Sequence, residues 1–179
     1  MVVSILGEDR PGIIYRVSRV LSDLNCNILE VSQTILKTEF AGIFLAAMPG
    51  DLTEDRLQES LHEELGPLGV TVTVKEFKER TEPLADKAEP YVITLRGGDR
   101  MGIIPEVAGV ISGFDVNVEN LKAIAQVNDP TNVVIVFEVA VPASVHMPAF
   151  REALRWKAEE LELELGLQHR EIFEAIYRI

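Results

Sequence analysis

Residues 9–14 read Asp-Arg-Pro-Gly-Ile-Ile, and residues 99–104 repeat them as Asp-Arg-Met-Gly-Ile-Ile. Positions 9–30 and 99–120 align without a gap and share 9 of 22 residues, where chance gives about one or two. The spacing of 90 residues is the size of a small domain rather than of a solenoid unit. The sequence therefore predicts a duplicated domain.

The chain of 179 residues divides into two domains of comfortable size. Two prolines bracket a polar stretch without periodicity at 81–90, which is typical of a linker. We therefore expect one domain over 1–80, a linker over 81–90 and a second domain over 91–179.

Each half shows the order strand, helix, strand, strand, helix, strand. Apolar residues recur at helical spacing after both copies of the repeated motif, as in Ile13, Val17, Val20 and Leu21. We expect 28–37 and 41–48 to form a hairpin in the first half, and 167–176 to be the last strand of the second. The expected fold class is α+β: two tandem ferredoxin-like βαββαβ domains, each with helices on one face of an antiparallel sheet.

The other face of each sheet must also be covered, because an exposed apolar sheet face is unfavourable in water. The two halves can cover each other, or a second chain can do so. We therefore expect a homodimer.

Composition excludes several classes of function. The net charge is −12 and no run of Lys or Arg occurs, which disfavours direct binding to nucleic acid or to an anionic membrane. No stretch approaches the ~20 apolar residues of a membrane span. The single cysteine, Cys26, fits a reducing compartment. With no signal peptide recognisable, we expect a cytoplasmic protein.

Nothing in the sequence points to catalysis. The three histidines, His62, His146 and His169, lie at non-equivalent positions of the two halves and lack metal-ligand spacing. No nucleophile–base pair, phosphate loop or dinucleotide fingerprint is recognisable. We therefore expect no enzyme activity, no metal and no cofactor.

The loop between the first strand and first helix of each half has the chemistry of a ligand site. A helix start exposes backbone N–H groups that suit a carboxylate, Asp9 and Asp99 can accept from an ammonium group, and Asn27 and Asn117 open the next strand. We expect these asparagines to lie beside the loop, so that the set suits an amino acid. An Asp before a helix is also a common N-cap, and this structural alternative stays open.

The segment from Gly7 to Ile28 resembles the opening of an ACT domain, a small regulatory module of amino-acid metabolism. The second half resembles it too, with Met101 at the proline position, so the resemblance covers nearly the whole chain. The tandem layout without a catalytic domain is similar to the glycine cleavage system transcriptional repressor family. This resemblance implies a cytoplasmic regulator that acts through another protein.

The resemblance also implies the ligand contacts, which are the loop residues and the asparagine that opens the second strand. In the first half they are Gly7, Glu8, Asp9, Arg10, Pro11, Gly12 and Asn27. In the second half they are Gly97, Gly98, Asp99, Arg100, Met101, Gly102 and Asn117. Met101 and the glycine pair before Asp99 predict a looser second corner and two sites of unequal affinity.

Two functions are therefore compared. The first is a non-catalytic regulator that binds a small ligand, expected to be an amino acid, where ACT domains meet, and that modulates a partner such as a transcription factor. The second is a protein-interaction module that needs no ligand and acts through its sheet and helix faces.

Overall fold

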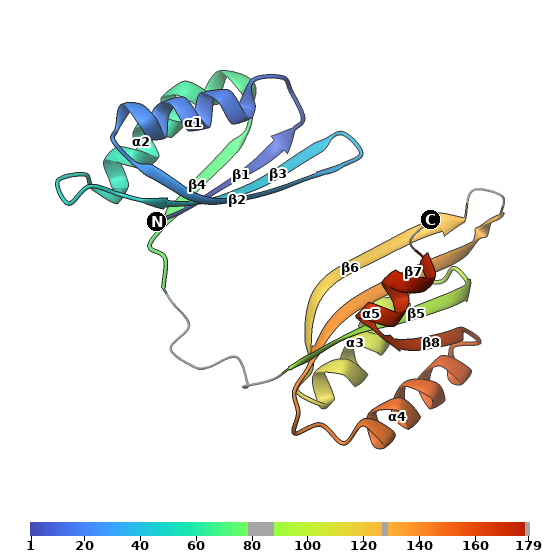
Figure 1. The fold of residues 1–179 in the computed structure, drawn as a ribbon. Coiled ribbons are helices and arrows are strands. Elements are labelled where there is room, and N and C mark those ends of the chain that lie inside the picture. Colours follow the sequence, from blue (N-terminus) through green and yellow to red (C-terminus); the bar gives the residue numbers. More distant parts are fainter. Residues whose placement is uncertain (79–87, 127–128, 178–179) are drawn as a thin grey trace. The chain divides into compact units, whose positions relative to one another are not determined.

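The computed structural model describes residues 1–78, 88–126 and 129–177. The chain divides into two compact units, Met1–Glu79 and Arg80–Ile179, and each contains the predicted βαββαβ order (Figure 1). Of the expected linker over 81–90, residues 81–87 lie outside the described residues. Glu89 and Pro90 already belong to the first strand of unit 2.

Unit 1 follows the predicted element order closely. Its elements are β1 (Val2–Glu8), α1 (Ile13–Asp23), β2 (Asn27–Leu36), β3 (Glu39–Ala47), α2 (Glu54–Leu65), the short 3-10 helix η1 (Gly66–Leu68) and β4 (Thr71–Lys75). The Thr53 side chain caps α2 by accepting a hydrogen bond from the Arg56 N–H, as a threonine at this position does.

The four strands of unit 1 form one antiparallel sheet in the order β2-β3-β1-β4. The apolar stripes of α1 and α2 pack on one face of this sheet, around the buried Phe44. Because Ile13, Val17 and Leu21 recur at helical spacing, all three enter this core.

Unit 2 repeats the architecture with one addition. Its elements are β5 (Glu89–Gly98), α3 (Ile103–Gly113), β6 (Asn117–Gln126), β7 (Asp129–Val141), α4 (Met147–Glu160), β8 (Glu164–His169) and α5 (Arg170–Tyr177). The sheet order is β6-β7-β5-β8, and α3 and α4 pack on one face around Phe137 and Phe150. The predicted fold class is thus confirmed in both units.

The prediction of a last strand over 167–176 is wrong beyond His169. Strand β8 ends there, and α5 begins at Arg170. Glu and Ala favour helix, and residues 170–177 contain Glu171, Glu174 and Ala175. The helix propensity of these residues therefore prevails over the expected continuation of the strand.

Helix α5 lies on the sheet face opposite α3 and α4, against β5 and β8 (Figure 1). The Arg170 guanidinium anchors it there through ion pairs with Glu119 (2.6 Å) and Glu138 (3.6 Å). On this face Val92 is only 2 % exposed. The equivalent face of unit 1 has no such helix among the described residues, and there Leu6 is 57 % and Ile43 is 53 % exposed.

The two units correspond residue by residue with one shift. Before the β2–β3 hairpin the offset is 90 residues, as between Gly12 and Gly102. After it the offset is 93, as between the helix N-caps Thr53 and His146. The hairpin of unit 2 is therefore three residues longer, and the correspondence is continuous on either side of it.

Candidate functional site

The two predicted loops share their backbone conformation at the helix start. Gly12 and Gly102 sit at the starts of α1 and α3 with φ angles of 100° and 96°, in the left-handed region that glycine accepts without strain. Each loop is attached to its hairpin by one backbone hydrogen bond of 2.7 Å, from the Asp9 N–H to the Thr38 carbonyl and from the Asp99 N–H to the Thr131 carbonyl. The repeat therefore copies the whole corner.

Neither helix has a side-chain cap. No side chain accepts a hydrogen bond at the N-cap of α1 or of α3, so Asp9 and Asp99 do not act as caps in the described structure. The first-turn N–H groups stay available, and a helix start of this kind attracts anions. The N-cap interpretation of the two aspartates is therefore wrong, whereas Gly12 and Gly102 do have a structural role in the turn.

The charged loop side chains lie at the surface and make local contacts. The Arg10 guanidinium donates to the Glu8 carboxylate at 2.6 Å and lowers the pKa of that carboxyl. Arg100 instead donates to the backbone carbonyl of Glu160 at 3.4 Å. The two arginines thus have different partners although they occupy equivalent positions.

A cavity of about 330 Å³ opens at the corner of unit 2, a volume near the lower end of small-molecule sites. The loop and α3 form one wall, and β6 and β7 form the other. It is lined by Asp99, Arg100, Met101, Gly102, Ile103, Ile104, Pro105, Ala123, Ala125, Val133 and Ile135. Four of the predicted site residues, those at 99–102, are therefore brought together around one hollow.

The glycines before each loop serve packing. A side chain at Gly7 would meet Val70 at 2.9 Å, and one at Gly97 would meet Leu163 at 2.6 Å. Because neither position carries a side chain, Val70 can approach β1 closely and Leu163 can approach β5 closely. The family resemblance predicts ligand contacts at Gly7 and Gly97, and close packing gives a separate reason for glycine at both positions.

The expectation that Asn27 and Asn117 lie beside the loop of their own unit is wrong. Strand β3 pairs with both neighbours, and along it Glu8 lies opposite Glu39 whereas Asn27 lies opposite Ala47. Eight residues of strand separate these two levels, roughly 26 Å at about 3.3 Å per residue. The cause is α1, because a strand that follows a helix begins where the helix ends. In unit 2 Asn117 likewise pairs opposite Ala140, far along β7 from Val133.

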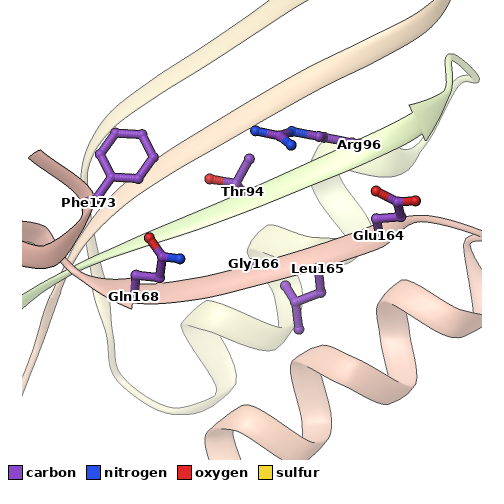
Figure 2. A pocket seen from close by; sticks show the side chains of 7 residues that line it. All are labelled: Thr94, Arg96, Glu164, Leu165, Gly166, Gln168 and Phe173. Carbon is purple, nitrogen blue, oxygen red and sulfur yellow. The ribbon is translucent and has the colours of Figure 1, made fainter. Parts of the chain in front are cut away.

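Sequence reasoning missed a second cavity, of about 210 Å³, beneath α5 (Figure 2). Phe173 of α5 stands over the sheet face from which Thr94 and Gln168 project. The Gln168 Oε1 atom is buried and has no hydrogen-bond partner within the described residues. A strand over 167–176 predicts no such cavity, because one wall of the cavity is formed by helix α5.

The described histidine, cysteine and acidic side chains form neither a metal site nor a reactive thiol. No group of three or more His, Cys, Asp or Glu side chains in the described ranges is arranged to hold a metal ion. Cys26 is buried, and desolvation raises the pKa of its thiol, which disfavours the reactive thiolate. None of the helices among these residues is long and apolar enough to cross a membrane.

Comparison with known proteins gives a consistent result. Residues 1–75 match the ACT domain family. The UPF0237 protein MK1213 of Methanopyrus kandleri is 40% identical over 75 residues, which make up 41% of this chain and 83% of that protein. The family match falls on unit 1.

Two crystal structures share the fold over both units. One is an unknown protein from Galdieria sulphuraria, with a TM-score of 0.76 at 23% identity, covering 94% of this chain and 96% of that chain. The other is a candidate glycine cleavage system transcriptional repressor, with a TM-score of 0.71 at 17% identity, covering 93% and 94%. The tandem arrangement of two such domains therefore occurs in other proteins.

Proposed function

Because the chain belongs to the ACT domain family, we propose that it is a non-catalytic regulator that binds an amino acid at an interface formed by ACT domains. The observation that carries this proposal is the cavity at the corner of unit 2. It combines an uncapped helix start, an acidic side chain and an apolar wall, which together match the carboxylate, ammonium and side chain of an amino acid.

The chemistry assigns each part of the ligand to a part of the cavity. The carboxylate lies against the first-turn N–H groups of α3, where the helix dipole favours negative charge. The ammonium group faces Asp99. An apolar side chain packs on Ala123 and Ala125 of β6, which leave more room than larger residues.

A neighbouring ACT domain completes the proposed site. Asn27 and Asn117 lie at the far end of the sheet from the loop of their own unit, so they reach a ligand only when another domain supplies them. Antiparallel pairing of two edge strands sets the start of one strand against the end of the other. A homodimer that pairs in this way brings an asparagine to each corner.

The regulatory output passes through a partner protein. The net charge of −12 disfavours direct contact with nucleic acid. A structural neighbour is described as a candidate glycine cleavage system transcriptional repressor, which supports a transcriptional regulator as the proposed partner. The proposed location is the cytoplasm, a reducing compartment that suits a single free cysteine. Ligand binding then acts by stabilising one arrangement of the domains that the partner recognises.

Thermal unfolding of the full chain with each of the twenty amino acids tests this proposal. A ligand present at 100 times its Kd stabilises the native state by about 2.7 kcal/mol, so at least one amino acid at millimolar concentration is expected to raise the Tm. If none does, the alternative of a ligand-free interaction module is favoured. Asn117→Ala also distinguishes the two functions. It weakens the Tm response to an amino acid if the protein is a ligand sensor, and it has no such effect if the protein is a ligand-free interaction module.

A further inference from the structure

The edge strands β4 and β8 differ in how their outward backbone groups are satisfied. In unit 1 the Gln58 side chain of α2 covers the edge of β4. Its Nε2 donates to the Val72 carbonyl at 2.8 Å, and its Oε1 accepts from the Val74 N–H at 2.7 Å. One side chain thus occupies the groups through which an edge strand pairs with another chain.

The same position in unit 2 holds a residue that cannot do this. With the offset of 93, Arg151 stands in place of Gln58, and Leu165 and Leu167 stand in place of Val72 and Val74. The register agrees, because Val72 lies opposite Ile5 and Leu165 lies opposite the equivalent Leu95.

A guanidinium only donates hydrogen bonds, so Arg151 cannot accept from the Leu167 N–H. In the part of the chain that the structure describes, no other side chain bonds to the backbone of Leu165 or Leu167. The edge of β8 is therefore open at the place where the edge of β4 is closed.

A groove of about 240 Å³ runs between this edge and α4. Its floor is apolar and consists of Ala158, Leu163, Leu165 and Leu167. In Figure 2, Leu165 points toward the helix side of β8, whereas Glu164 and Gln168 point to the opposite face.

Two arginines line the rim of the groove. Arg151 and Arg155 lie one turn apart on α4, and both are exposed. Within the described ranges neither forms an ion pair with a carboxylate within 4 Å, and Glu159 is the one acidic residue among those that line the groove. The surface beside the open strand edge is therefore locally positive, although the protein as a whole has a net charge of −12.

We propose that this groove binds an extended acidic segment of a partner protein, which adds to β8 as a further strand. Its backbone pairs with the Leu165 carbonyl and the Leu167 N–H, as strand addition requires. Its carboxylates pair with Arg151 and Arg155 in charge-assisted hydrogen bonds, and an apolar side chain between them packs on the leucine floor.

A second copy of this chain fits the groove less well. Antiparallel pairing of two β8 strands places the two α4 helices side by side on one face of the joined sheet. The arginines of the two copies then lie close together and repel each other. The charge therefore favours an acidic partner.

This inference rests on the proposed function only in that the protein acts through a partner. It concerns a different surface from the ligand cavity, so each can fail alone.

The test uses the full chain and a capped peptide, acetyl-Thr-Glu-Thr-Val-Thr-Glu-Thr-amide, which places Glu, Val and Glu on one face of a strand. Trp156 is the single tryptophan; it follows Arg155 on α4 and is 65 % exposed, so its fluorescence reports binding. We expect saturable binding, and protection of the Leu167 amide from hydrogen exchange when peptide is present.

Arg151→Gln gives β8 the residue that covers β4. We expect it to weaken peptide binding at least tenfold and, without peptide, to slow exchange of the Leu167 amide at least tenfold. The matched control Arg56→Gln removes the same charge from an exposed position of α2 and leaves both measurements unchanged. Circular dichroism establishes that both variants are folded.

Two altered peptides separate the contribution of the strand hydrogen bonds from that of the peptide's charges. A peptide methylated at the valine nitrogen loses a strand hydrogen bond, and one with Lys in place of both Glu reverses the charge; each is expected to bind at least tenfold more weakly. Equal binding of either peptide, absence of binding by the parent peptide, or full binding to Arg151→Gln overturns the proposal. Dimerisation of the free chain that Arg151→Gln abolishes also overturns it, in favour of a second copy. The Tm response to amino acids is measured on the same variants and reports separately on the ligand site.

Discussion

The two corners share a backbone and differ in the wall that faces it. In unit 1 the ring of the buried Phe40 lies close to Gly42, whose missing Cβ would be 2.8 Å from that ring. The equivalent residues of unit 2 are Val133 and Ile135, and they line the 330 Å³ cavity. The repeated motif thus fixes the loop conformation, while residues on β6 and β7 outside the motif decide how much space remains beside it.

Core truncations give the largest expected effect and test whether the units unfold independently. Leu61 and Leu154 are equivalent and buried, so Leu61→Ala and Leu154→Ala each cost about 2–5 kcal/mol in the unit that carries the change. Trp156 fluorescence during urea unfolding reports unit 2. We expect Leu154→Ala to lower its transition and Leu61→Ala to leave it within about 0.5 kcal/mol. An equal shift from both variants would contradict independent units.

Gly42→Ala tests the packing of the wall in unit 1. The new methyl group meets the Phe40 ring at 2.8 Å, and overpacking of this kind costs about 1–3 kcal/mol, measured as a loss of unfolding free energy. Gly50→Ala is the control, because a Cβ there meets nothing within 4 Å. In a background with Phe40→Val, the residue of unit 2, we expect Gly42→Ala to cost less than it does in the unaltered chain; an equal cost in both backgrounds would show that the ring is not the obstacle.

Exchanging the walls tests the proposed ligand cavity. Ala123→Gln with Ala125→Ile gives unit 2 the residues that unit 1 has at these positions. We expect affinity for the amino acid found by thermal unfolding to fall about tenfold, or about 1.4 kcal/mol, by calorimetry. Ile124→Val, on the opposite sheet face of β6, serves as the control. Two binding sites of equal affinity in the unaltered chain would contradict the predicted inequality of the corners.

The smallest expected effect concerns the longer hairpin of unit 2. Asp129 accepts from the Thr131 N–H at 3.1 Å and from its hydroxyl, and these bonds lower the pKa of the Asp129 carboxyl. A lowered pKa in the folded state means that this stabilisation is present above the pKa of the unfolded chain and is lost as pH falls through the folded value. We expect the Thr131 amide shift in NMR spectra to titrate with a midpoint below the ordinary aspartate value. Asp129→Asn should abolish that titration, and a midpoint at or above the ordinary value would refute the assignment.

The sequence predicted what the repeat and the periodicity encode. The helix face of Ile13, Val17 and Leu21 and the strand–loop–helix order at each corner follow from local patterns. Asn27 was misplaced because closeness in sequence ignores the length of the helix in between. The closure of β4 by Gln58 has no local signal, since it joins residues 14 and 16 positions apart that meet only once α2 packs beside the strand.

Helix α5 has a consequence for the number of attachment points on one chain. Duplication of a domain with an open apolar sheet face gives two equivalent faces, and when each face binds the same face of another chain, association continues from chain to chain. Because α5 lies over the face of unit 2, held by Arg170 on Glu119 and Glu138, the face of unit 1 is the one that stays open among the described residues. One open face of this kind lets two copies meet and offers no second face to a third copy, so α5 limits how many copies such contacts can join.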